Sequence, residues 1–225
     1  PEVDLDAIVD RHGALRHGTT GPDRLYVATR RRPPELAVLL LLDRSLSSDA
    51  WVGGRRVLDV ATGALVALGE GLEQVRASTA ILAFHSNTRR DCRVAAIKEL
   101  ATPWATAHAR LAALEPAGYT RIGPAVRHAT ATLAGMQARR KLLVLLSDGK
   151  PTDYDRYEGR YGLADVRRSI IEASERGIHA FGLALDARAG DHLPRMFGRG
   201  GFAIVSRPPD LIAAMGRLYR ERLVA

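Results

Sequence analysis

Oxygen-bearing side chains follow directly on an apolar run early in the chain. The run 36–42 stops at Asp43, and Ser45 and Ser47 follow at steps of two residues. In a loop that stays extended after a strand, residues two apart project to the same side, so the three side chains can converge on one point. Oxygen is the ligand atom that hard cations such as Mg²⁺ prefer. The spacing therefore predicts a metal site after this run.

A second apolar run ends in the same way. Residues 142–146 are followed by Ser147, Asp148 and Gly149. In doubly wound sheets, ligands bind outside the carboxyl ends of the two strands between which the chain order reverses. If these two runs are strands that flank the reversal, Asp43 and Asp148 face one crevice.

The segment 118–120 offers a third contribution to the same crevice. Thr120 carries a hydroxyl group and lies just before a helix that is expected from Gly123 onward. The first N–H groups of a helix have no partner within the helix, so they are available to a ligand.

The elements that must position these residues alternate along the chain. From residue 35 onward, apolar runs of strand length alternate with segments of helical period, which is typical of a parallel sheet covered on both faces. The second and third strands are separated by five residues, too few for a helical crossover, so we expect an antiparallel hairpin there. The predicted fold is α/β: a Rossmann-like, doubly wound, mostly parallel sheet with one antiparallel edge strand and flanking helices. The predicted strands are 36–43, 79–85, 91–97, 141–148, 178–185 and 201–205, and the predicted helices are 57–76, 104–114, 123–137, 163–176 and 209–220.

Composition indicates one soluble globular domain. Of the 225 residues, 46% are hydrophobic and 26% charged, which is ordinary for this class. Residues 1–35 carry charges, prolines and glycines without a sustained period, so they are predicted to be a lead-in or linker, with the domain at 36–225. The apolar runs are far shorter than the roughly 20 residues of a membrane span, and no secretory signal pattern opens the chain. The single cysteine, Cys92, excludes an internal disulfide. We expect a cytoplasmic protein without a membrane partner.

The charge balance suits an acidic partner. Lysine and arginine number 33 and aspartate and glutamate 25, a formal charge of +8. The basic clusters 30–32, 139–141 and 167–168 are short and dispersed. They also lack the interleaved aromatic residues that stack on bases. We therefore expect no nucleic-acid partner and interpret these clusters as solvated surface.

The five oxygen-bearing residues together resemble a known constellation. Asp43, Ser45, Ser47, Thr120 and Asp148 are similar, in order and approximate spacing, to the metal-ion-dependent adhesion site (MIDAS) of von Willebrand factor type A (VWA) domains. The resemblance covers about residues 35–222. It implies a cation held directly by the three hydroxyl groups, with the two aspartates acting largely through water.

The same resemblance implies how a partner is bound. Neutral hydroxyl ligands leave the charge of the ion under-compensated, so an open coordination position favours a carboxylate supplied by a partner protein. Mg²⁺ is the expected ion, because hydroxyl-rich sites with few direct carboxylates suit the smaller cation. Mn²⁺ and Ca²⁺ remain open.

A closer resemblance, to the C-terminal region of CbbO and NorD proteins, is carried by residues 48–52, 97–98, 103–104, 118–123 and 148–162. Those proteins are adaptors of hexameric MoxR-type AAA+ ATPases. CbbO-type proteins direct a CbbQ-like motor to inhibited Rubisco, and NorD-type proteins serve nitric oxide reductase maturation. The first reading is a CbbO-type subunit of a Rubisco activase that docks an Asp or Glu of the client. The alternatives are a NorD-type protein and a different MoxR-associated VWA protein.

Candidate partner-binding residues surround the two aspartates. Arg44 and Lys150 lie one and two residues from them and would extend a positive field. The segment 154–162 is rich in tyrosine and arginine, which are common at interface hot spots. Its alternative interpretation is a rigid loop whose tyrosines fold back on the following helix. The candidates are Arg44, Tyr119, Lys150, Tyr154, Arg156, Tyr157 and Arg160.

Other functions fit the sequence less well. If Asp43 and Asp148 only capped strands, the presence of Ser45, Ser47 and Thr120 at matching positions would be a coincidence. A nucleotide-hydrolysing reading of 143–148 lacks the Gly-x-x-x-x-Gly-Lys-Ser/Thr loop. No Gly-x-Ser-x-Gly nucleophile elbow occurs, and the seven histidines show no paired ligand spacing. We therefore expect a non-catalytic adaptor.

Overall fold

The computed structural model describes residues 2–3, 5–20, 26–27, 35–147, 150–184 and 190–205. The chain divides into two compact units, residues 1–33 and residues 34–225. In the first unit, strand β1 (Glu2–Val3) pairs antiparallel with β2 (Tyr26–Val27), and helix α1 spans Leu5–Arg16. The sequence analysis did not predict α1. The helix has no apolar stripe that could have been recognised in the sequence, because apolar side chains such as Val9 and Leu15 are exposed and not buried along one face.

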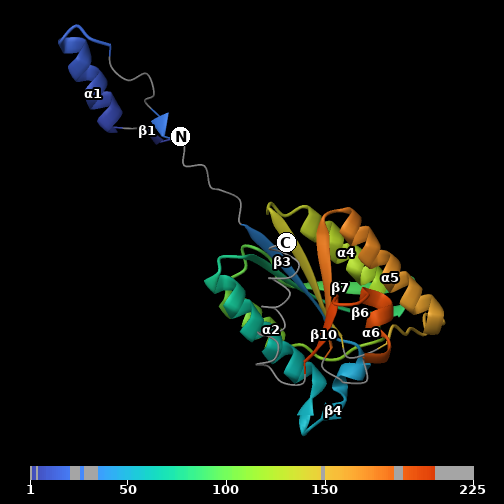
Figure 1. Ribbon diagram of the computed structural model, residues 1–225. Coiled ribbons are helices and arrows are strands. Elements are labelled where there is room, and N and C mark those ends of the chain that lie inside the picture. The colour runs from blue at the N-terminus through green and yellow to red at the C-terminus, as the bar shows by residue number, and fades with distance from the viewer. Residues whose placement is uncertain are drawn as a thin grey trace. The chain divides into compact units, whose positions relative to one another are not determined.

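The second unit is built on a sheet of six strands in the order β10-β9-β8-β3-β6-β7 (Figure 1). All neighbouring strands are parallel except β6 and β7, which form an antiparallel hairpin at one edge. The α/β fold with one antiparallel edge strand is therefore confirmed. The strands are β3 (Leu36–Asp43), β6 (Ser78–Thr88), β7 (Asp91–Lys98), β8 (Arg140–Leu146), β9 (Ile178–Ala184) and β10 (Phe202–Ile204).

The chain order reverses between β3 and β8. From β3 the chain passes to β6 and β7 on one side, and then returns to β8 on the other. The register places Leu42 beside Leu146 and Asp43 beside Phe84 of β6. The carboxyl ends of the two apolar runs are therefore neighbours, as the sequence analysis required for a shared crevice.

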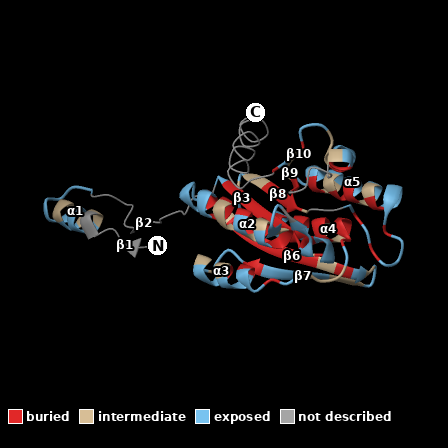
Figure 2. Ribbon diagram, turned by 90° about the horizontal axis from the view of Figure 1, so that it is seen from below, coloured by how far each residue is buried: buried red, intermediate tan, exposed pale blue. Residues whose placement is uncertain are grey.

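Helices cover both faces of the sheet, and the central strand is buried on each. In β3, Val38, Leu40 and Leu42 contribute to the core under α2, whereas Leu39 and Leu41 contribute to the core under α4 and α5. Because side chains alternate between faces, a strand covered twice must be apolar throughout. Figure 2 shows this burial along the sheet. The helices are α2 (Val57–Gln74), α3 (Trp104–Ala112), α4 (Ile122–Ala134), α5 (Gly159–Glu175) and α6 (Leu193–Phe197).

Some elements differ from the sequence expectations. Strand β8 ends at Leu146, two residues earlier than expected, and α5 begins at Gly159, four residues earlier. The loop after β3 is extended at Ser45 but not throughout, because a short 3₁₀ helix, η1, spans Leu46–Asp49. A two-stranded hairpin, β4 (Trp51–Val52) with β5 (Arg55–Arg56), follows it and was not predicted. The predicted helix 209–220 lies outside the described residues.

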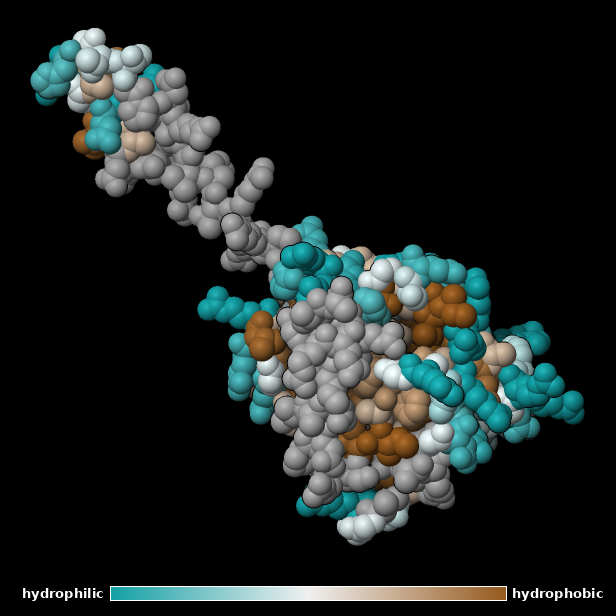
Figure 3. Space-filling view, viewed as in Figure 1, coloured by the Kyte–Doolittle hydropathy of each residue, from teal (hydrophilic) through white to brown (hydrophobic). Residues whose placement is uncertain are grey.

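The surface of the second unit is mixed. Figure 3 shows hydrophilic side chains spread over the visible face, with smaller hydrophobic patches between them. None of the described helices is long and apolar enough to cross a membrane.

Candidate metal and partner-binding site

Asp43 is the last residue of β3 and lies at the centre of the candidate site. Its side chain is 2% exposed. Carboxylate oxygen Oδ1 accepts a hydrogen bond from the backbone N–H of Ser45 at 2.9 Å, and Oδ2 accepts one from the Ser147 hydroxyl at 2.7 Å. The Thr120 hydroxyl lies 3.5 Å from Oδ1. Asp43 thus joins the end of β3, the end of β8 and the loop before α4.

Ser45 and Ser47 converge although the loop between them is not extended throughout. Their hydroxyls are hydrogen bonded to each other, with the two Oγ atoms 2.9 Å apart. Ser45 is buried, whereas Ser47 lies on the exposed surface of η1. The turn is held by Ser48, whose N–H and hydroxyl both donate to the Ser45 carbonyl, at 2.9 and 2.7 Å. Ser47 therefore opens the oxygen cluster to solvent.

The distance between the two serine oxygens fits a small cation. Adjacent ligands of an octahedral Mg²⁺ with bonds near 2.1 Å are about 3.0 Å apart. The observed 2.9 Å is close to this separation, and it is also an ordinary length for the hydrogen bond between the two hydroxyls. Within the described ranges, no three His, Cys, Asp or Glu side chains gather into a metal-binding group. A cavity of about 10 Å³ beside Asp43 is about the size of one water molecule.

Thr120 is fixed by its backbone as well as by its place beside Asp43. It is 1% exposed. Its N–H donates to the Thr152 carbonyl at 2.8 Å, and the N–H of Thr152 donates back at 3.0 Å. The loop before α4 and the loop after β8 are thereby paired. Asp148, the fifth predicted ligand, lies outside the described residues.

The predicted cationic residues occupy different environments. Lys150 is exposed. Arg44 is half-buried, and its Nε atom is buried without a hydrogen-bond partner among the described residues. The Arg44 backbone binds Phe84 and Ala117, which fixes it between β6 and the loop before α4. Of the two, Lys150 presents its charge more openly to a partner.

The tyrosine-rich segment divides into exposed and buried members. Tyr154 is 77% and Tyr119 39% exposed, and Arg156 and Arg160 are exposed too. Tyr157 is only 1% exposed, so the prediction that its side chain contacts a partner is wrong. Its hydroxyl donates to Asp165 Oδ2 at 2.5 Å and accepts from the N–H of Gly123 at 3.1 Å. For Tyr157 the alternative holds: it folds back on the following helix.

Arg121 organises this segment, and the sequence analysis missed it. The guanidinium Nε donates to Asp153 Oδ2 at 2.8 Å, and Nη2 binds Asp155 Oδ1. The same group lies 4.2 Å above the Tyr157 ring, and its side chain is 6% exposed. Burial alone would lower the pKa of Arg121, but the hydrogen bond and charge of Asp153 raise it above its ordinary value. The available signals were the place of Arg121 within the segment 118–123 and the two-residue spacing of the aspartates.

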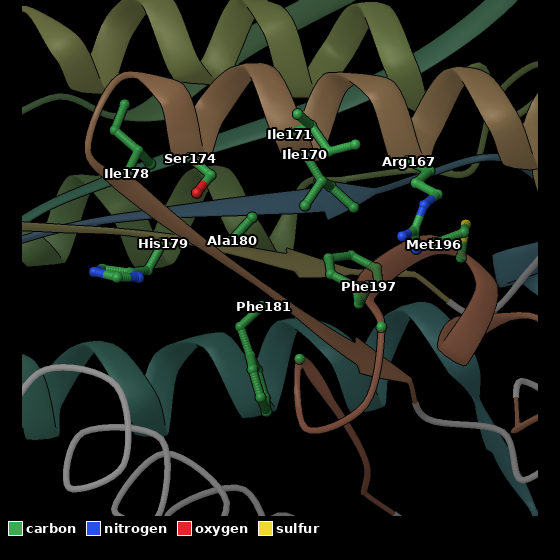
Figure 4. A pocket seen from close by; sticks show the side chains of 12 residues that line it. Arg167, Ile170, Ile171, Ser174, Ile178, His179, Ala180, Phe181, Met196 and Phe197 are labelled. Atoms are coloured by element: carbon green, nitrogen blue, oxygen red, sulfur yellow. The ribbon is translucent and has the colours of Figure 1, made fainter. Parts of the chain in front are cut away.

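A cavity in the second unit lies away from the oxygen cluster. It has a volume of about 260 Å³, opens between α5, α6 and β9, and is lined mainly by apolar residues with Arg167 and His179 (Figure 4). None of the predicted site residues lines it. The oxygen cluster is therefore separate from this cavity.

Comparison with known proteins supports a family assignment. The model of the von Willebrand factor type A domain matches residues 37–211. Protein NorD of Brucella suis is 46% identical over 97% of this chain and 35% of its own length. Protein NorD of Stutzerimonas stutzeri is 39% identical over 92% of this chain and 34% of its own. The chain thus spans about a third of the length of these curated relatives.

Solved structures share the fold at low identity. The PilB minor pilin of Streptococcus sanguinis has a TM-score of 0.64 at 16% identity, covering 88% of this chain and 63% of that one. The von Willebrand factor domain of the pilus tip protein Mfa5 of Porphyromonas gingivalis has a TM-score of 0.59 at 12% identity, with coverages of 86% and 96%.

Proposed function

Because the chain belongs to the von Willebrand factor type A domain family, we propose that it binds protein partners through a divalent cation at the carboxyl edge of its sheet. The observation that carries this proposal is the convergence of the Ser45 and Ser47 hydroxyls, 2.9 Å apart, beside Asp43 and Thr120. The resemblance to a MIDAS adds Asp148 as the fifth member. Mg²⁺ is the proposed ion.

The chemistry of these ligands favours an acidic partner. When bound, the cation supplies a positive charge that neutral hydroxyls only partly compensate, so it attracts a carboxylate. The exposed Ser47 marks the side from which an Asp or Glu of a client can approach. Buried Asp43 holds the serine turn in place through the N–H of Ser45. The role proposed for the chain is binding, without catalysis.

The names of the similar proteins favour one client protein over the other. Several relatives carry the name NorD, with identities of 39 to 46%. We therefore place the NorD-type reading, an adaptor between a MoxR-type AAA+ ATPase and nitric oxide reductase, ahead of the Rubisco activase reading. The Rubisco reading becomes the alternative. In either case the chain corresponds to about a third of the relatives' length. The contact with the ATPase is therefore proposed for the whole protein and not for this chain alone.

A pull-down tests the metal-dependent contact. The 225-residue chain is immobilised and exposed to purified nitric oxide reductase, with inhibited Rubisco as the alternative client. We expect retention of nitric oxide reductase in Mg²⁺, release in EDTA and recovery when Mg²⁺ is restored. Asp43→Asn keeps the shape of the side chain and is expected to abolish retention. Undiminished retention in EDTA, with metal removal verified by elemental analysis, would refute the proposal.

A second measurement tests the absence of catalysis. The purified chain is incubated with ATP or with unfolded casein, and phosphate or peptide release is followed. We expect no turnover. Turnover that disappears in Asp43→Asn would show that the oxygen cluster is an active site.

A further inference from the structure

Three exposed apolar side chains lie at the rim of the oxygen cluster. Leu46 is 57%, Tyr119 39% and Tyr154 77% exposed. Leu46 stands between the two serines, and Tyr119 directly precedes Thr120. Tyr154 follows Thr152, the backbone partner of Thr120, by two residues. We call these three residues the apolar shelf.

The members of the apolar shelf come from distant parts of the sequence, and the structure brings their segments together. The rings of Tyr119 and Tyr154 have centroids 6.5 Å apart and are tilted by 49°, within the range of an aromatic pair. The N–H of Leu46 donates to the carbonyl of Gly118, next to Tyr119, at 3.0 Å. Three separate loops thus bring apolar side chains to the same edge of the sheet.

The backbone beneath the tyrosines is held firmly. The N–H of Tyr119 donates to the Ser86 carbonyl at 2.6 Å, and its carbonyl accepts from the Ser86 N–H at 2.9 Å. Tyr154 stands between Asp153 and Asp155, both of which pair with buried Arg121. Its own N–H donates to the Asp153 carboxylate at 2.7 Å. An exposed aromatic ring on an ordered backbone loses little conformational entropy when it binds a partner.

Single exposed apolar residues are common on protein surfaces, but these three adjoin a site proposed to bind a carboxylate. We propose that the apolar shelf receives a large apolar side chain directly next to that carboxylate in the client. The recognised element is then an Asp or Glu flanked by large apolar residues, and not an isolated acidic residue. This inference rests on the proposed function, since the carboxylate places its neighbours over the shelf.

Peptide titrations test the inference. The ¹⁵N-labelled chain in Mg²⁺ is titrated with three acetylated, amidated pentapeptides, Ser-Leu-Asp-Phe-Ser, Ser-Gly-Asp-Gly-Ser and Ser-Leu-Asn-Phe-Ser, and dissociation constants are taken from amide shifts. We expect the first to bind about fivefold more tightly than the second, the magnitude of one aromatic contact. The third should bind weakly, because it lacks the carboxylate.

Variants assign the preference to the shelf. Tyr154→Ala and Tyr119→Ala should remove the fivefold preference, so that each variant binds Ser-Leu-Asp-Phe-Ser and Ser-Gly-Asp-Gly-Ser with the same affinity. Val75→Ala is the matched control: Val75 is 68% exposed but follows α2 just before Ser78, which pairs with Ala37 at the opposite end of β3. Amide spectra of each variant verify the fold.

The outcomes separate the two proposals. If both aspartate peptides bind with equal affinity and EDTA abolishes the binding, the inference about the apolar shelf is wrong and the proposed metal site is supported. Binding of the asparagine peptide as tight as that of Ser-Leu-Asp-Phe-Ser, insensitive to EDTA and lost in Tyr154→Ala, overturns the metal site and not the surface. If Ser-Leu-Asp-Phe-Ser causes no shifts at the amides of Tyr119 and Tyr154, the inference is wrong.

Discussion

The backbones of Thr120 and Thr152 are hydrogen bonded in both directions, with N···O distances of 2.8 and 3.0 Å. This pair fastens the loop before α4 to the loop after β8. Because Thr120 is a proposed metal ligand and Tyr154 a proposed partner contact, disturbance of one loop should be felt in the other.

Removal of the buried arginine should destabilise the fold. Arg121→Ala leaves the side chain of Asp153, 0% exposed, without its ion-pair partner, and loss of one partner of a buried pair costs about 3 kcal/mol or more. Chemical unfolding measures the loss. Arg56→Ala is the control and should cause a much smaller change, since the partners of Arg56 among the described residues are the exposed carboxylates of Asp49, Asp59 and Glu115. Equal losses would show that the Arg121 pairs contribute no more than surface pairs.

Two adjacent serines should give opposite results. Ser47→Ala removes an exposed proposed ligand, so Mg²⁺ affinity should fall at least tenfold while the free energy of unfolding changes by less than about 0.5 kcal/mol. Ser48→Ala removes the buried hydroxyl that donates to the Ser45 carbonyl, which should cost about 1 kcal/mol of stability. Calorimetric Mg²⁺ titration and thermal unfolding measure the two effects. Unchanged Mg²⁺ affinity in Ser47→Ala would exclude it as a ligand.

Charge near the site should act mainly on association. Lys150 is exposed, so Lys150→Ala should slow client association by a factor that shrinks as salt screens the field. Arg44→Ala should act in the same direction. EDTA, by contrast, should raise the dissociation rate. Surface plasmon resonance at two salt concentrations separates these contributions, and a salt-independent loss in Lys150→Ala would indicate direct contact in place of steering.

The stability of the fold should fall at alkaline pH in a way that depends on Tyr157. Burial, followed by the hydrogen bond to Asp165, raises the pKa of Tyr157 above 10. The unfolded chain therefore loses this proton first, and the contribution to stability is complete below about pH 10 and declines as the pH rises above it. Tyr157→Phe should lower stability at neutral pH by about 1 to 2 kcal/mol.

Urea unfolding between pH 8 and 11 measures the Tyr157 effect. The wild-type and Tyr157→Phe curves should converge as the pH rises. Tyr161→Phe, which alters a tyrosine that is 62% exposed, is the control and should leave the pH dependence unchanged. Parallel curves for wild type and Tyr157→Phe would contradict the prediction.

Local patterns in the sequence determined most of the core. The unbroken apolar run of β3 predicts a strand covered on both faces, because only a central strand buries both sets of its alternating side chains. The short gap between β6 and β7 predicts the antiparallel hairpin for a similar reason, since a helix cannot fit within it. The two-residue steps from Asp43 to Ser45 and Ser47 identified the oxygen cluster, although Ser47 reaches it through a 3₁₀ turn.

Only the tertiary structure decided which residues of the tyrosine-rich segment face outward. Tyr154 and Tyr157 are three residues apart in the same segment, yet one is 77% and the other 1% exposed. The difference arises because Arg121, more than 30 residues away in the sequence, binds Asp153 and Asp155 and covers the Tyr157 ring. Ion pairs between residues so far apart in the sequence produce no periodic pattern from which they could be predicted. They exist only once the sheet has brought the loop before α4 beside the loop after β8.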